Sequence, residues 1–134
     1  MEYVGEVSGA ERDGLLRGAK ALLNPIRWPE PFGLVMIEAL ACGTPVIAFR
    51  RGSVPEIISD GQTGFLVDSV EAAAQAVGRI AEIDRHVCRE TFERRFSARR
   101  MAQDYVEVYR RLASRESTDV QNFLLPGVVD RIGA

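Results

Sequence analysis

The chain contains 134 residues, of which 46% are hydrophobic and 27% charged, and its formal net charge is -2. This length and balance predict one globular domain with enough apolar material for a single core. The slightly acidic charge argues against nucleic acid as a partner, because phosphate recognition normally needs a basic surplus.

The sequence offers few residues for a metal site or a disulfide framework. Cys42 and Cys88 lie far apart and lack CxxC spacing, so two thiols in a reducing cytosol are the simpler interpretation. The single histidine, His86, lies among charged residues and is interpreted as solvent-facing. No apolar run approaches the roughly 20 residues that span a bilayer, and the N-terminus does not resemble a signal peptide. We expect a cytoplasmic protein, with attachment to the inner face of the membrane left open.

Short apolar runs and helical patterns alternate along the first part of the chain. Residues 2–7 are predicted as a strand, and the capping-box spacing of Ser8 and Glu11 opens a helix that ends near Gly18. A second strand is predicted at residues 20–24.

A proline-rich loop at residues 26–31 then leads into a helix from about Gly33 to Ala41. The third predicted strand covers residues 45–49.

The second part of the chain repeats this order once and then becomes helical. Ser53 and Glu56 have capping-box spacing and predict a short helix that ends near Asp60, before a fourth strand at residues 64–67. Three further helices are predicted at residues 70–83, 86–95 and 97–113, the last with apolar residues at Met101, Tyr105, Val108 and Leu112.

The helical pattern fails from Ser114 onward. We therefore predict a domain at residues 1–113 and a C-terminal tail at residues 114–134, with a short docked segment at residues 123–125. Alternating strands and helices indicate an α/β fold with a parallel sheet between two helical layers, a Rossmann-like αβα arrangement. Four strands are few for such a sheet, which suggests that part of it lies on the N-terminal side of this sequence.

The junction at residues 30–38 combines two glutamates with a loop that enters a helix. In open α/β sheets, ligands bind beyond the carboxyl ends of the strands, and a helix N-terminus there offers unpaired N–H groups to an anion. Gly33 lets a ligand approach the backbone. Glu30 and Glu38 would repel a phosphate but can accept hydrogen bonds from hydroxyls. A ligand with hydroxyl-rich ends around a diphosphate is a nucleotide sugar.

The segment EPFGLVMIEA, which begins at Glu30, resembles the E-x7-E motif of the retaining family-4 glycosyltransferases. Later segments also resemble that family: GTPVI from Gly43, GSVPE from Gly52 and DGQTGFLV from Asp60. Several ordered motifs make the resemblance specific, and it covers roughly residues 2–113.

This resemblance implies a GT-B fold, in which two Rossmann-like domains face a cleft, and makes residues 1–113 part of the C-terminal, donor-binding domain. It implies that Glu30 is catalytic, binding sugar hydroxyls and orienting the donor, and that Glu38 accepts from the ribose hydroxyls. The backbone amides that would hold the sugar and diphosphate are those of Phe32, Gly33, Leu34 and Val35. The implied reaction transfers a hexose from a UDP- or GDP-sugar with retention of configuration, without metal or cofactor. Two interpretations of Gly52 stay open: it lies in a loop near the cleft, or it serves only as a tight turn.

The resemblance also implies that an N-terminal acceptor-binding domain, two strands and the basic pair that grips the diphosphate lie outside this sequence. We therefore expect the chain alone not to transfer sugar. A strand order of 3-2-1-4-5-6 would leave strands 3 to 6 with exposed edges. We expect residues 3–7 to pair beside residues 22–24; the alternative is a homodimer that pairs strands between chains. Finding residues 3–7 unpaired would contradict both.

Two other functions are compatible with parts of the pattern. The chain could serve as a non-catalytic nucleotide-binding or assembly module. It could also belong to another doubly wound class, such as a nucleotide-sugar epimerase, which would not need the pair of glutamates.

Overall fold

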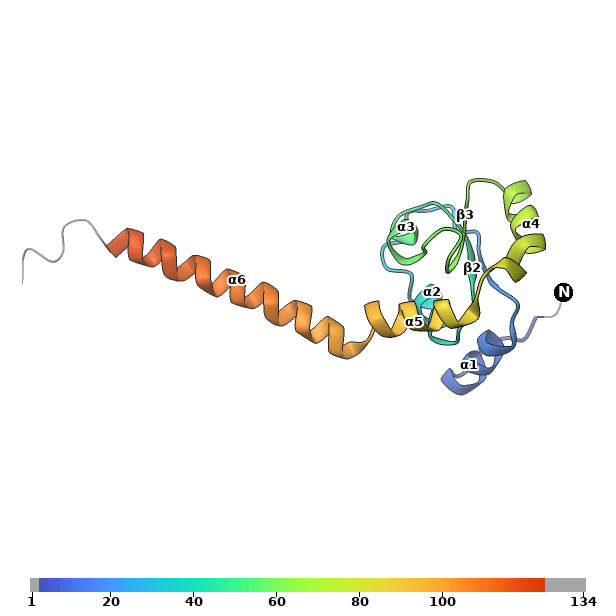
Figure 1. Ribbon diagram of the computed structural model, residues 1–134, viewed down its shortest axis with the longest axis horizontal. Helices are drawn as coiled ribbons and strands as arrows, with labels where there is room; N and C mark the ends of the chain where they lie inside the picture. Colours follow the sequence, from blue (N-terminus) through green and yellow to red (C-terminus); the bar gives the residue numbers. More distant parts are fainter. Residues whose placement is uncertain (1–2, 125–134) are drawn as a thin grey trace, which may run out of the picture. The chain divides into compact units, whose positions relative to one another are not determined.

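The computed structural model describes residues 3–124 of the chain, with side chains described as far as residue 114. The chain divides into two units, Met1–Phe96 and Ser97–Ala134. Within residues 3–124 every strand lies in the first unit, and the described part of the second unit is a single helix. Figure 1 labels the helices and strands.

The first unit is built on a parallel sheet of three strands in the order β1-β2-β3. These strands are β1 (Leu22–Asn24), β2 (Val46–Phe49) and β3 (Gly64–Val67). All four residues of β2 are buried, as expected for a strand with neighbours on both edges. The predicted parallel α/β fold is confirmed, and three of the four predicted strands are present.

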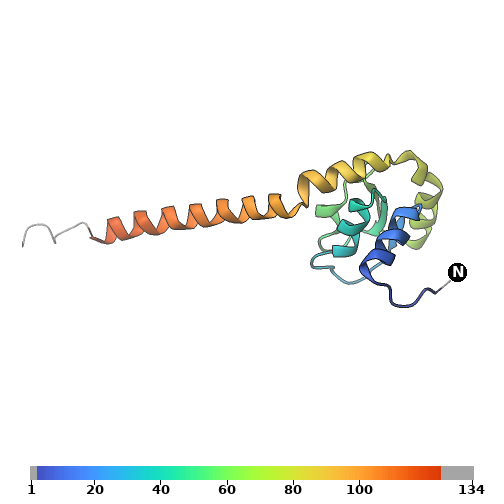
Figure 2. The ribbon, with the colours of Figure 1, turned by 90° about the horizontal axis from the view of Figure 1, so that it is seen from below.

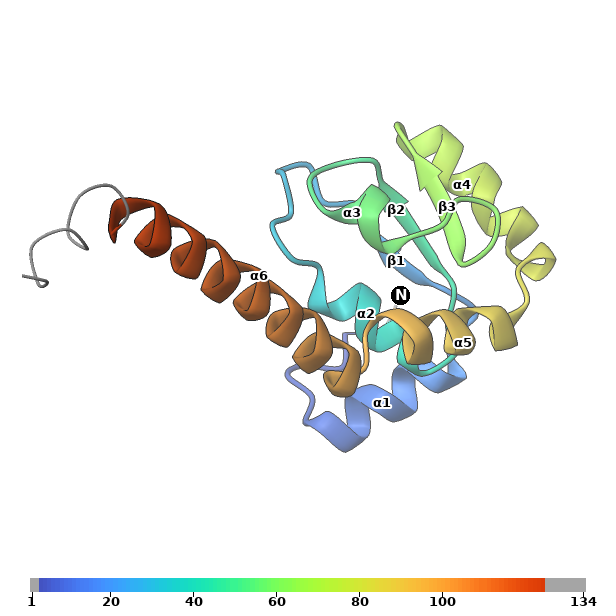
Figure 3. The same cartoon turned by 60° about the vertical axis from the view of Figure 1, so that its left-hand side comes forward.

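Helices cover both faces of this sheet (Figure 3). On one face lies α2 (Leu34–Ala41), which buries Met36, Ala39 and Leu40. It packs between α1 (Gly9–Gly18) and α5 (Arg85–Arg95), and α1 and α2 run side by side in Figure 2. On the other face, α4 (Val70–Arg79) packs over β2 and β3 and continues into the 3-10 turn η1 (Ile80–Glu82). A one-turn helix, α3 (Val54–Ile57), joins β2 to β3.

Arg85 ties the end of α1 to the start of α5. Its guanidinium donates to the backbone carbonyls of Ala19 at 2.6 Å and Arg17 at 2.8 Å, and to the hydroxyl of Thr44 at 2.9 Å. The Thr44 hydroxyl donates in turn to the carbonyl of Leu16 at 2.5 Å. A cation therefore satisfies carbonyls that the C-terminal end of α1 leaves without helical partners.

The strand predicted at residues 2–7 is absent from its described part, residues 3–7. Tyr3 is 92% exposed and Val4 54% exposed, and this segment pairs with no strand. Gly5 has a φ of 74°, which is not the extended conformation that a strand requires. The predicted pairing of this segment beside β1 is therefore wrong, and the version in which it pairs between two chains loses its basis as well.

The second unit contains α6 (Ala98–Leu124), which is longer than the helix predicted at residues 97–113. The apolar stripe ends near Leu112, but no glycine or proline interrupts the sequence before Pro126, so nothing local stops the helix. Residues 123 and 124 of the predicted docked segment lie in α6, and Leu125 lies outside the described residues. None of the helices within residues 3–124 is both long and apolar enough to cross a membrane.

One helix boundary and one helix cap also differ from the sequence prediction, and a second predicted cap is present. The short helix predicted to end near Asp60 ends at Ile57, and Ser53 does not cap it with its side chain. The capping box of Ser8 and Glu11 is confirmed, with the Glu11 carboxylate accepting from the Ser8 N–H at 3.0 Å. This hydrogen bond lowers the pKa of Glu11.

Candidate functional site

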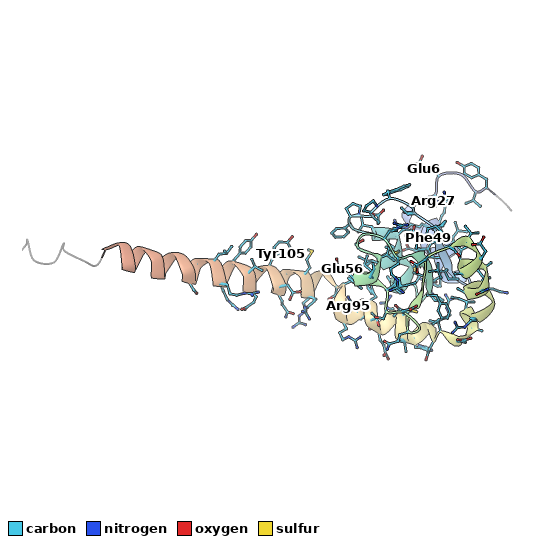
Figure 4. All side chains as sticks on the ribbon, turned by 90° about the horizontal axis from the view of Figure 1, so that it is seen from above. Glu6, Arg27, Phe49, Glu56, Arg95 and Tyr105 are labelled. Carbon is cyan, nitrogen blue, oxygen red and sulfur yellow. The ribbon has the colours of Figure 1, made fainter. Side chains whose placement is uncertain are left out.

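The carboxyl ends of β1 and β2 are followed by two loops that lie against each other. The first, residues 25–33, leads from β1 into α2, and the second, residues 50–53, leads from β2 into α3. The N–H of Ser53 donates to the carbonyl of Glu30 at 2.8 Å and so joins the two loops. Figure 4 marks Arg27 in the first loop and Phe49 at the end of β2. This edge of a parallel α/β sheet is where ligands usually bind.

Gly52 allows the two loops to approach each other. Its φ is 53°, and an added Cβ would meet the backbone oxygen of Glu30, the nitrogen of Glu30 at 2.5 Å and the carbonyl carbon of Pro29 at 2.9 Å. Gly52 is thus a tight turn and also a packing partner of the segment that carries Glu30. The tight-turn interpretation is therefore confirmed, and the place of Gly52 at a ligand cleft stays a prediction.

Gly33 stands at the N-cap of α2 in the left-handed conformation, with φ 75° and ψ 40°. An added Cβ there would meet Cε of Met36 and Cδ1 of Ile57, the latter at 2.8 Å. The position therefore favours glycine for its backbone angles, and any side chain there would also have to displace the ends of the Met36 and Ile57 side chains.

The first turn of α2 presents unpaired backbone donors. The N–H of Met36 already donates to the carbonyl of Gly33 at 3.0 Å. The N–H groups of Leu34 and Val35 have no hydrogen-bond partner within residues 3–124, and both residues are exposed. Such groups at a helix N-terminus, where the macrodipole is positive, favour a bound anion.

Glu30 is partly buried directly before this turn. Its Oε1 accepts from the N–H of Gly33 at 3.0 Å, which fixes the side chain against the start of α2. A carboxylate has about four lone-pair sites, so further hydrogen bonds from hydroxyl groups are available to it. The predicted site residues Glu30, Phe32, Gly33, Leu34 and Val35 are thus gathered at one place.

Glu38, the second glutamate of the motif, lies one turn further along α2. Its Oε1 forms an ion pair with Nη1 of Arg12 on α1 at 2.9 Å, and its side chain is 31% exposed. The sequence prediction did not include this partner.

The structure adds polar residues at the same edge that the sequence prediction missed. Asn24, the last residue of β1, is buried, yet its Nδ2 has no hydrogen-bond partner among the described residues. The same holds for the buried Oγ of Ser53, close to Gly33. Buried polar atoms are normally satisfied, by water or a ligand if not by protein. The signal that could have found both residues is their position at, or a few residues beyond, the carboxyl end of a predicted strand.

Two exposed arginines also lie on the two loops. Arg27 follows β1 and Arg51 follows β2, and neither has an ion-pair partner within the described part of the chain. The neighbouring Arg50 instead lies 3.7 Å from Asp60. The two free guanidinium groups give this edge of an overall acidic chain a local positive charge.

A separate apolar cavity of about 300 Å³ lies between the sheet and α4. It is lined by side chains such as Leu23, Phe49, Val70 and Val77, and it contains neither of the motif glutamates. A cavity of this composition cannot satisfy a diphosphate or sugar hydroxyls, so the polar edge at α2 is the candidate site.

Comparison with known proteins identifies the family of the chain. Residues 1–95 match the family model described as glycosyl transferases group 1. The chain is 30% identical over 124 residues to a phosphatidyl-myo-inositol mannosyltransferase of Mycobacterium leprae, covering 87% of this chain and 33% of that protein. It is 35% identical over 88 residues to an N-acetyl-alpha-D-glucosaminyl L-malate synthase of Bacillus anthracis, covering 60% of this chain and 23% of that protein.

A solved structure also resembles the fold of this chain. A sucrose-phosphate synthase from Thermosynechococcus elongatus superimposes with a TM-score of 0.73 and 32% sequence identity, over 85% of this chain and 30% of that one. The chain thus spans about a third of the length of these relatives or less. The family match extends over most of the sheet-containing unit, and the chain belongs to the glycosyl transferases group 1 family.

Proposed function

We propose that this chain forms the donor-binding part of a glycosyltransferase that moves a hexose from a nucleotide sugar to an acceptor with retention of configuration. The observation that carries the proposal is the first turn of α2, where the unpaired N–H groups of Leu34 and Val35 lie beside the carboxylate of Glu30. This combination suits a diphosphate joined to a hydroxyl-bearing sugar.

The chemistry follows from those two groups. As the bond between the anomeric carbon and the diphosphate oxygen breaks, its electron pair passes to the diphosphate, and the α2 N–H groups stabilise that charge. The acceptor oxygen bonds to the anomeric carbon, and its proton passes to the departing diphosphate on the same face, which retains configuration. Glu30 accepts hydrogen bonds from the sugar hydroxyls and fixes the orientation of the donor. Arg27 and Arg51 add positive charge for the diphosphate.

The acceptor and its binding site are assigned to parts of the protein beyond these residues. The chain spans about a third of the relatives' length. We therefore propose that the 134-residue chain on its own does not transfer sugar and binds nucleotide sugars only weakly. The donor is a UDP- or GDP-sugar, and its binding needs no metal, since helix-end amides and arginines supply the counter-charge.

The test is nucleoside diphosphate release from a panel of UDP- and GDP-sugars by the complete natural protein. We expect Glu30→Gln to lower kcat about 10²-fold, the effect of removing one group that acts on the transition state. Glu90→Gln, on the exposed surface of α5, is the matched control and should turn over like the wild type. Wild-type turnover by the Glu30 variant would refute the assignment. Binding of a nucleotide sugar without any release of nucleoside diphosphate would favour a nucleotide-binding module.

A further inference from the structure

Arg12 connects α1 to the second glutamate of the motif. Its Nη1 lies 2.9 Å from Oε1 of Glu38, and its Nη2 lies 3.3 Å from Oδ1 of the neighbouring Asp13. The Arg12 side chain is 41% exposed, while its Nε is buried without a partner among the described residues. The Nε atom is therefore covered by protein, and the charged end of the side chain is directed to Glu38.

The ion pair between Arg12 and Glu38 is expected to add little to the stability of the fold. Partly exposed ion pairs contribute little to the free energy of folding, because solvent screens them and two long side chains lose freedom. What the pair does provide is a fixed orientation. A glutamate that is already held when a ligand arrives does not lose that freedom on binding, and preorganisation of this kind increases affinity.

We propose that Arg12 is a positioning residue for nucleotide binding, acting through Glu38. It holds Oε1 of Glu38, so that Oε2 is left to accept hydrogen bonds from the ribose hydroxyls. Its positive charge also offsets the negative charge that Glu38 would otherwise place near the donor's diphosphate. This inference rests on the proposed function and adds to it the residue that sets the preference for a nucleotide with an intact ribose.

The test compares ribose with dideoxyribose nucleotides on the 134-residue chain. Affinities for UDP and GDP and for their 2′,3′-dideoxy analogues are measured by amide chemical-shift titration, which detects weak binding. We expect the wild type to prefer the ribose form of its nucleotide about tenfold, the value of one to two hydrogen bonds. Arg12→Gln should reduce the preference to about twofold or less, while binding of the dideoxy form changes little.

Two further variants separate positioning from a general structural role. Arg17→Gln, an exposed arginine of the same helix, should keep the wild-type preference. Arg12→Lys retains the charge and a donor for Glu38 and should recover part of the preference, and it serves as the test if Arg12→Gln does not fold.

The outcomes distinguish this inference from the proposed function. An Arg12→Gln variant that folds and keeps the wild-type preference overturns the role of Arg12 and leaves the donor site intact. An Arg12→Lys variant that recovers none of the preference also overturns it. If no nucleotide shifts the amides of Leu34 and Val35 in the wild type, the donor site itself is wrong, and the role of Arg12 falls with it.

Discussion

Replacing Gly52 by alanine should separate the two loops that form the candidate site. The new Cβ would clash with the backbone oxygen of Glu30, with the Glu30 nitrogen at 2.5 Å and with the carbonyl carbon of Pro29 at 2.9 Å. Backbone cannot rotate away as a side chain can, so the loops must move apart. The 2.8 Å hydrogen bond from Ser53 to Glu30 is then stretched or lost.

The expected loss of stability has two parts. Placing a residue with a Cβ at a φ of 53° costs about 1–2 kcal/mol. Overpacking and the lost hydrogen bond add about 2 kcal/mol. The total of about 3–4 kcal/mol is a large part of the stability of a small domain. Urea unfolding followed by circular dichroism measures it.

Gly61 provides a control for the first part alone. Its φ is 73°, but an added Cβ would meet nothing within 4 Å. Gly61→Ala should therefore lose only about 1–2 kcal/mol. Equal losses for Gly52→Ala and Gly61→Ala would mean that the two loops are not in contact in solution, and the geometry proposed for Glu30 would be wrong.

The remaining predictions concern the packing of the first unit. Arg85→Ala removes three hydrogen bonds at the end of α1 and should lower the unfolding free energy by about 2–4 kcal/mol, measured by urea unfolding; a loss below 0.5 kcal/mol would contradict the network. Ser69→Ala removes the side-chain acceptor for the N–H of Ala72 and should cost about 1 kcal/mol in the same assay, whereas an unchanged midpoint would show that this cap is not formed. Burial raises the pKa of Cys88 to about 11, so a thiol reagent at pH 8 should label Cys42 first and Cys88 only on unfolding. In the unfolded chain the Cys88 thiol has its ordinary pKa of 9.0, so it ionises between pH 9 and 11 while the folded thiol stays protonated. The free energy of unfolding should therefore fall as the pH rises from 9 to 11, and Cys88→Ser should remove this dependence.

The fold was predictable where local pattern and tertiary packing agree. β2 and β3 are short apolar runs between turn residues, and both are strands at the predicted positions. Residues 3–7 also contain apolar residues, but the segment does not pair with the edge strand β1, and Gly5 has a φ of 74° instead of an extended conformation. Strand propensity depends on neighbours, which one short segment does not reveal.

The length of α6 illustrates the opposite error. The end of its apolar stripe near Leu112 was interpreted as the end of the helix. Periodicity reports which face of a helix is buried, whereas helix continuation depends on backbone propensity and the absence of breakers. The chain has no breaker before Pro126, and the helix extends to Leu124.

The candidate site was only partly predictable. The spacing of Glu30 and Glu38 and the glycine before the helix located the loop-to-helix junction from the sequence. The partners of these residues come from distant segments: Gly52 and Ser53 pack on Glu30, and Arg12 pairs with Glu38. Contacts across such separations follow from the tertiary fold, and one sequence contains no direct signal for them.

The central claim is that a nucleotide donor binds at the first turn of α2. Titrating the isotope-labelled chain with UDP and GDP, and mapping the amide shifts, tests it most directly. The account predicts that one of the two nucleotides shifts the amides of Leu34 and Val35 most strongly, together with those of Gly52 and Ser53. Largest shifts along the apolar cavity between the sheet and α4, or saturating binding with no change at Leu34 and Val35, would contradict it.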